Sequence, residues 1–376
     1  MPRKYDLILY FLFKIDVSIE MLKRKSYFLL MKTVITSGEK DRLSKGRVEA
    51  YLNEFKGHVF EFLVASKLAN CLGLYSQFLS SLDSSELERL QYYERSIREN
   101  DSGLYECLPR IADETSLVIQ ESVDLKDLSE ILLTGRMSNH LLKQNNIEDL
   151  AEADLMLKST TNKISLLSLK FGKYGSFVNT KSGGLKSFLQ KYFAPFSSSD
   201  LDQKQINFKL QESFQLMGAD LYKDLEENFD GNFELWRTKG RSELPGELDE
   251  CYKDIIHSFY FMQIQQIHSS LKKYFQEDRE KFFSCLFPLL GFSSMEIIQV
   301  FSFYEKKQLS YNSKEAWCVD ISKLKHINSL SLGELKAGSS SFEITHPSFI
   351  LQIRVKPMNK FTSAALKINC GLKWLR

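Results

Sequence analysis

The sequence has no paired-cysteine motif and no spacing typical of a zinc site. Its six cysteines and six histidines are scattered along 376 residues, and no two cysteines form a C-x-x-C pair. A structural zinc site needs closely spaced Cys or His ligands, so the pattern argues against one. A chain of this length can bury a core without disulfides, and free thiols in a cytoplasmic protein are the simpler expectation.

The N-terminal region lacks an apolar run long enough to cross a membrane. Its apolar stretch, Leu7 to Phe13, ends at Lys14 and Asp16. A transmembrane helix needs about 20 apolar residues, and no small-residue cleavage site follows this stretch. We therefore expect a buried strand or the start of a helix here, rather than a signal peptide.

The chain has no large excess of either charge, because its formal net charge is only +2. Any affinity for nucleic acid must therefore come from local clustering of cations. The stretch from Leu351 to the C-terminus contains no Asp or Glu. It carries Arg354, Lys356, Lys360, Lys367, Lys373 and Arg376, interleaved with Asn359, Thr362, Ser363 and Asn369. This alternation favours strands whose polar face contacts DNA phosphates and bases, although a solvent-exposed basic tail gives the same pattern.

Two apolar segments separated by a polar turn predict a β-hairpin. The first opens with Asp154, and the second runs from Ile164 to Phe171. Because side chains alternate along a strand, Ser168 and Lys170 share one face. A lysine on an apolar strand is unfavourable without a negative partner, which Asp154 can supply. Such a pair can bind a divalent metal and orient a water toward a phosphate.

An Asp on one strand and a Ser-x-Lys triplet on the next resemble the pattern of the PD-(D/E)XK nuclease superfamily, in particular its type II restriction endonucleases. Two positions depart from that pattern. Ala153 precedes Asp154 where the family has Pro, and Ser168 stands where most members have a second acid. Some members recruit a glutamate from a helix instead. Glu61 is the candidate here, because Gly57 to Glu61 is similar to the Gly-x-x-Phe-Glu helix of many members.

The resemblance covers residues 50–195 and implies an α/β, restriction-endonuclease-like core in which helices flank a mixed sheet. It implies that Asp154 and Glu61 hold Mg²⁺, that Lys170 assists the attacking water, and that Ser168 supplies a hydrogen bond. It also implies double-stranded DNA as substrate, a homodimer, a cognate DNA methyltransferase and a prokaryotic cytoplasmic location.

Each of these residues has a simpler interpretation. Glu61 can be a surface glutamate of a helix or a partner of Lys170. Asp154 can cap a turn, and Lys170 can protect the edge of a sheet from aggregation. If Glu61 does not supply the second acid, Glu152 is the reserve candidate, because it shares a strand face with Asp154.

The segment from Asn179 to Gly184 precedes an expected helix, Leu185 to Phe193. Its backbone N–H groups and the helix start could cradle a phosphate, which makes Asn179, Lys181 and Ser182 candidate DNA contacts. It is not a Walker A loop, because the Gly-x4-Gly-Lys-[Ser/Thr] order is absent. A solvated loop that caps the helix is the alternative.

Three regions are expected in all: an N-terminal extension (1–46), a nuclease core (47–195) and a recognition region (196–376), first helical and then β-rich. The expected helices are Arg47 to Leu72, Ser80 to Glu99, Leu125 to Asn145, Tyr252 to Phe275 and Arg279 to Leu290, with residues 201–305 mainly helical. The expected strands are Leu117 to Ile119, Ala316 to Asp320, Phe349 to Val355 and Ala364 to Trp374.

The favoured function is a Mg²⁺-dependent, sequence-specific endonuclease acting on double-stranded DNA. One alternative is a repair or transposition nuclease of the same superfamily. Another is a catalytically inactive DNA-binding protein, in which the absence of an acid at Ser168 is a true loss. A helical scaffold without a DNA role is a third.

Overall fold

The computed structural model describes residues 45–134, 153–292, 297–307, 310–319, 329–358 and 360–375. Most of the expected N-terminal extension lies outside these ranges, as do the candidate residues Glu152 and Asn359, together with Arg376. The chain divides into two compact units. The first comprises Met1–Lys173 and Val300–Cys318, and the second comprises Tyr174–Gln299 and Val319–Arg376. Both contain helices and a sheet, so the mixed α/β class is confirmed.

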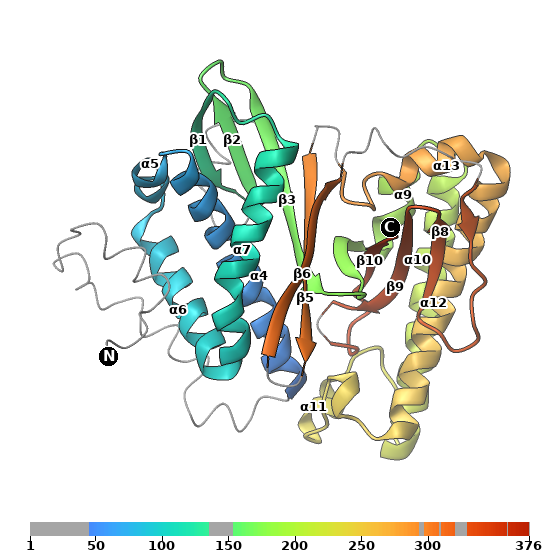
Figure 1. Cartoon of the computed structure of the whole chain (residues 1–376). Helices are drawn as coiled ribbons and strands as arrows, with labels where there is room; N and C mark the ends of the chain where they lie inside the picture. Colours follow the sequence, from blue (N-terminus) through green and yellow to red (C-terminus); the bar gives the residue numbers. More distant parts are fainter. Residues whose placement is uncertain are drawn as a thin grey trace. The chain divides into compact units, whose positions relative to one another are not determined.

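Helix α4 is central among the helices of the first unit, because the other three pack against it (Figure 1). In chain order, the four helices are α4 (Lys45–Cys71), α5 (Tyr75–Ser80), α6 (Ser84–Asn100) and α7 (Ser102–Ser122). α4 packs against α6 and α7 on the helical side and contacts β1 (Leu128–Leu133) and β3 (Ile164–Lys173) of the sheet. From Val59 to Ala69 most of its side chains are buried, so this helix is the core of the unit. It runs through Gly57 without interruption.

The sheet of the first unit has five strands in the order β1-β2-β3-β5-β6. β2 (Leu155–Ser159) and β3 form the expected antiparallel hairpin, with Leu155 opposite Leu167. Its turn places Asn162 at a φ of 61°, a left-handed conformation that asparagine tolerates. β5 (Ile297–Lys307) and β6 (Ser310–Val319) come from much later in the chain and complete the sheet beside β3.

Three predictions in or beside this unit are wrong. Residues 117–119 lie in α7 rather than in a strand, because the buried positions of α7 repeat with helical spacing. Residues 128–133, placed within a helix from Leu125 to Asn145, form β1, whose backbone pairs with β2. Residues 297–305, grouped with the helical region, belong to β5. A continuous apolar segment suits either a buried helix or a buried strand, and pairing with neighbours decided these cases.

The second unit has helices on one face of its sheet. They are α9 (Phe188–Tyr192), α10 (Ser199–Tyr222), α11 (Glu234–Thr238), α12 (Glu250–Glu277) and α13 (Arg279–Leu286), with short 3-10 turns Leu185–Ser187, Lys223–Leu225 and Pro245–Glu247. α10 packs against α12, and α12 contacts β8 (Ser341–His346) and β9 (Phe349–Pro357). The two helices expected from Tyr252 and from Arg279 are therefore confirmed. No described helix is long and apolar enough to cross a membrane.

Five strands in the order β4-β10-β9-β8-β7 make the sheet of the second unit (Figure 1). β4 (Val178–Gly184), β7 (Ser331–Leu332) and β10 (Leu366–Trp374) join β8 and β9, and every adjacent pair is antiparallel. The strands expected near Phe349 and Ala364 are confirmed as β9 and β10, and the strand expected near Ala316 is confirmed as β6 of the first unit. The segment from Asn179 to Gly184 is β4 and not a phosphate-cradling loop, because its backbone groups pair with β10. The helix expected from Leu185 starts as a 3-10 turn and continues as α9.

Candidate functional site

Helix α4 holds Glu61 beside strand β3. Phe60 is fully buried and stacks on Phe171 of β3, with ring centroids 4.4 Å apart. Lys56, one turn earlier, donates a hydrogen bond of 3.1 Å to the Tyr304 hydroxyl on β5. These contacts fix the rotation of α4 at Glu61, whose side chain is 16% exposed.

Asp154 lies where the chain enters β2, and its carboxylate is held by β3. The backbone N–H of Leu169 donates a 2.6 Å hydrogen bond to Asp154 Oδ2. The Ser168 hydroxyl donates to the same oxygen over 3.3 Å. The Asp154 N–H in turn donates to the Leu167 carbonyl over 2.8 Å. These bonds fix the Asp154 carboxylate against β3 on the side of Ser168, at the end of the hairpin away from its turn.

The carboxylates of Asp154 and Glu61 and the Lys170 amine influence one another electrostatically. Burial and the negative charge of Glu61 raise the pKa of the Asp154 carboxyl well above its usual range, while Lys170 and the two hydrogen bonds oppose that rise. A nearby like charge and desolvation both disfavour the ionised carboxylate. Asp154, just before β2, therefore accepts a hydrogen bond from Ser168 on β3 and is influenced by the charges of Glu61 on α4 and Lys170 on β3. A bound cation would relieve the repulsion between the two acids.

His58 belongs to the same group, although it was not among the residues predicted from the sequence. Its Nδ1 lies 3.3 Å from Glu61 Oε2, and its ring stacks on Tyr93 with centroids 5.6 Å apart. The hydrogen bond to Glu61 raises the pKa of the imidazole above its ordinary value, although burial opposes the rise. The spacing of three residues on one helix was the available signal, since such residues are neighbours on a helix surface.

The candidate ligands fit a magnesium ion only as a minimal site made of two carboxylates. Among the described residues, no cluster of three or more His, Cys, Asp or Glu side chains could hold a metal. Mg²⁺ is commonly bound by one or two carboxylates, with waters and substrate phosphates completing the octahedron. Asp154 and Glu61 supply such a pair, and the Asp154 Oδ1 atom accepts no hydrogen bond from the described part of the chain. Glu152 lies outside the described residues.

The predicted DNA-binding residues lie in the second unit. Arg354 and Lys356 are on β9, Lys367 is on β10, and Asn179, Lys181 and Ser182 are on β4. The antiparallel register places Ser182 opposite Asn369 and Lys181 opposite the buried Cys370. Lys360 differs from the other cations, because its amine forms a salt bridge with Glu243, which also accepts a hydrogen bond of 2.6 Å from Thr362.

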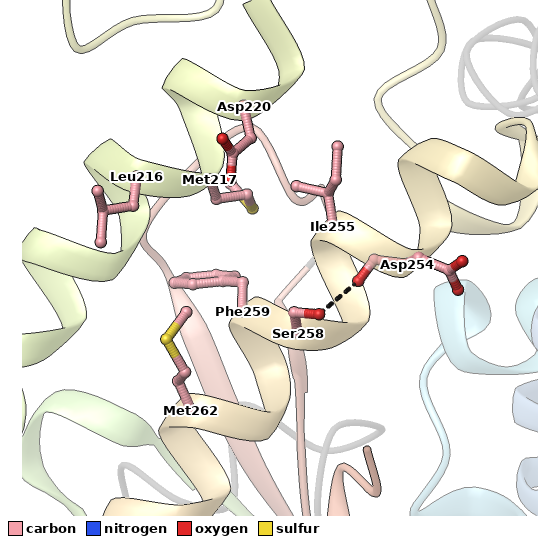
Figure 2. A pocket seen from close by; sticks show the side chains of 8 residues that line it. All are labelled: Leu216, Met217, Asp220, Asp254, Ile255, Ser258, Phe259 and Met262. Atoms are coloured by element: carbon pink, nitrogen blue, oxygen red, sulfur yellow. Dashed lines mark hydrogen bonds between the residues drawn. The ribbon is translucent and has the colours of Figure 1, made fainter.

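A cavity of about 240 Å³ lies between α10 and α12 (Figure 2). Leu216, Phe259 and Met262 give it an apolar lining, and Asp220 stands at its edge. Small-molecule sites usually enclose about 300–1,000 Å³. None of the predicted site residues lines it, so we do not assign it to the candidate site.

In comparisons with family models, curated proteins and solved structures, nothing matches this chain. The interpretation of the site therefore rests on the arrangement of its own residues.

Proposed function

We propose that this chain is a Mg²⁺-dependent endonuclease that hydrolyses phosphodiester bonds of double-stranded DNA at a specific sequence. The observation that supports this proposal best is the convergence of Asp154, Glu61 and Lys170, which come from a helix and from two strands of the sheet. Two carboxylates that repel each other, together with a lysine whose charge opposes that repulsion, match the needs of metal-assisted phosphodiester hydrolysis. A purely structural group would gain nothing from the repulsion between the two acids.

In the proposed reaction the side chains have separate tasks. Asp154 and Glu61 would hold the cation, which when bound supplies electrostatic stabilisation of the charge that develops on the phosphate. The Leu169 N–H and the Ser168 hydroxyl keep the Asp154 carboxylate oriented. His58 holds Glu61. Lys170 would orient the attacking water and offset negative charge on the scissile phosphate.

Plasmid digestion with and without Mg²⁺ tests the proposal. Discrete fragments that require Mg²⁺ support a site-specific endonuclease. A smear that requires Mg²⁺ indicates a nuclease without sequence specificity, as in repair or transposition. Absence of cleavage with every plasmid, under conditions in which the protein is folded and binds DNA, contradicts the proposal.

A catalytically inactive DNA-binding protein is the second candidate, and one observation favours it. Ser168 is only 2% exposed and takes the place of the second acid found in most members of the similar superfamily. If Glu61 does not act as the second ligand, Asp154 alone would offer Mg²⁺ a single protein carboxylate, which binds it weakly. DNA binding in Ca²⁺ without cleavage in Mg²⁺ would identify this case. From the same resemblance we propose that the protein is a homodimer, that it is paired with a DNA methyltransferase, and that it works in a prokaryotic cytoplasm.

A further inference from the structure

Two lysines face each other directly across neighbouring strands of the second sheet. Lys356 on β9 is paired with Lys367 on β10, and Arg354 on β9 is paired with Asn369. Opposed residues in an antiparallel pair share a face, with Cβ atoms about 5 Å apart. Arg354, Lys356 and Lys367 therefore cluster on one face, the face opposite to the buried row of Ile353, Val355 and Ile368.

This arrangement is unfavourable for the isolated protein. Like charges placed directly opposite each other destabilise a sheet. Partial burial, followed by the charges of Lys367 and Arg354, lowers the pKa of the Lys356 amine. Within the described part of the chain, Arg354, Lys356 and Lys367 form no salt bridge. Glu343 on β8 lies on the same face, but it is paired with Gln352 rather than with a cation.

The edge strand β4 continues the face that carries these cations. On β4, Gly184 is opposite Lys367 and has no side chain to cover it. Next along the strand, the Ser182 hydroxyl donates a 2.8 Å hydrogen bond to Asn369 Oδ1, so both side chains are held on this face. We call the surface of Ser182, Arg354, Lys356, Lys367 and Asn369 the basic face.

We propose that the basic face binds the phosphate backbone of double-stranded DNA through Arg354, Lys356 and Lys367. Side chains two residues apart on a strand are separated by about 7 Å. A DNA strand carries a charge about every 3.4 Å along the helix axis. A polyanion can therefore engage the three cations at once and remove their mutual repulsion. The inference rests on the proposed function only for the identity of the polyanion as duplex DNA.

The chain supplies a matched control for this inference. Lys360 belongs to the same acid-free stretch but is neutralised by Glu243. A contact between Lys360 and a DNA phosphate would therefore displace few of the counterions condensed on the DNA. Contacts made by Lys356 and Lys367 would each displace about one. The sequence alone ranks these lysines equally, and the tertiary contact separates them.

The test measures binding of a fluorescent 30-base-pair duplex to the full chain by fluorescence anisotropy. Binding is measured at a series of NaCl concentrations, with Ca²⁺ in place of Mg²⁺ so that cleavage does not interfere. For the K356Q/K367Q variant, the slope of log K against log[NaCl] should be shallower by about two units than for the wild type. For K360Q the slope should stay within error of the wild type. The double variant should melt no lower than the wild type, because a like-charge pair has been removed.

An unchanged slope in K356Q/K367Q, or failure of the wild type to bind the duplex at low salt, overturns the inference. Displacement of the duplex by inorganic phosphate at constant ionic strength also overturns it, since the face would then be a site for a small anion. Cleavage is scored separately in Mg²⁺. If the wild type cuts DNA but the slope is unchanged in K356Q/K367Q, the proposed nuclease function is supported and the role of the basic face is contradicted. If the slope changes as expected but DNA is not cut, the basic face is supported and the nuclease function is contradicted.

Discussion

The backbone N–H of Leu169 and the Oδ2 atom of Asp154 are joined by a hydrogen bond of 2.6 Å. This bond ties the candidate metal ligand to β3, the strand that carries Lys170, so the Asp154 carboxylate is held against that strand by a main-chain contact. It also uses one oxygen of the carboxylate and leaves Oδ1 for a ligand. A catalytic group that is oriented by main-chain contacts loses little entropy when it binds.

The first prediction concerns Asp154 and Lys170. Asp154→Asn retains an acceptor for Leu169 and Ser168 but removes the charge, and Lys170→Met retains most of the side-chain length without the amine. We expect both to reduce the rate of plasmid cleavage by at least about 10²-fold, because each removes an electrostatic contribution to the transition state. Lys163→Met, in the exposed turn of the same hairpin, is the control and should cut normally. Full activity in either site variant would remove the nuclease assignment from this hairpin.

The second prediction concerns Glu61. Glu61→Gln keeps the volume of the side chain and should reduce cleavage by about 10²-fold or more, because a single carboxylate binds Mg²⁺ weakly. The control is Glu54→Gln, since Glu54 lies 4.0 Å from the other nitrogen of the same His58 ring. A stronger loss in the Glu54 variant would mean that the histidine, and not a metal, explains the effect.

Restoring an acid at position 168 extends that test. Ser168→Asp in the Glu61→Gln background should recover part of the activity, because it places a carboxylate where most of the similar superfamily has one. Ser168 is almost fully buried. The larger, charged side chain should therefore lower the free energy of unfolding by about 1–3 kcal/mol. Chemical denaturation of both variants separates this loss of stability from the gain in activity.

The third prediction is a pH effect on the second unit. Asp202 on α10 receives hydrogen bonds from Lys273 (2.8 Å) and Tyr274 (2.7 Å) on α12. Burial alone would raise the pKa of Asp202, but these bonds and one from Ser198 lower it overall. The contribution of Asp202 to the free energy of unfolding is thus fully present above the pKa of the unfolded state, about 4. It is lost as the pH falls through the lower pKa of the folded state.

Asp202→Asn should accordingly lower the free energy of unfolding by about 1–2 kcal/mol at pH 7, a figure reduced for the solvent exposure of Lys273. Urea titrations at pH 7 and at acid pH measure it, and the difference from the wild type should shrink in acid. Asp200→Asn is the control, because Asp200 lies in the same first turn of α10 and shares only the helix-dipole effect. Equal losses in the two variants would contradict the prediction.

The fourth prediction compares Gly57, inside α4, with Gly73, just past its end. Gly57 is inside the helix, and a Cβ there would lie 3.9 Å from Glu61 Oε1, an ordinary contact. Gly57→Ala should stabilise the protein by about 0.5–1 kcal/mol, because glycine is a poor helix former. Gly73, just past the helix, has a φ of 71°. Gly73→Ala should destabilise by about 1–2 kcal/mol, since alanine is strained in the left-handed region. Thermal unfolding of both variants measures the opposite signs.

Local sequence patterns were enough to predict the hairpin of Asp154 and Lys170, the long helix that carries Glu61, and the β-rich C-terminal region. In each, the spacing of apolar residues and the turn residues between them agree with the local structure that formed. The sequence did not determine which apolar runs are strands. Residues 128–133 and 297–305 became strands because neighbouring strands accept their backbone hydrogen bonds, a choice that local spacing does not encode.

Which polar side chains meet depends on how distant segments of the chain pack together. His58 became a partner of Glu61, Lys360 was neutralised by Glu243, and Lys356 was placed against Lys367 with no acid between them. Electrostatic interactions depend on distance and burial, which segments far apart in the chain acquire only when they pack together. For this reason the sequence could nominate charged residues, while the fold decided which are paired and which are available to a ligand.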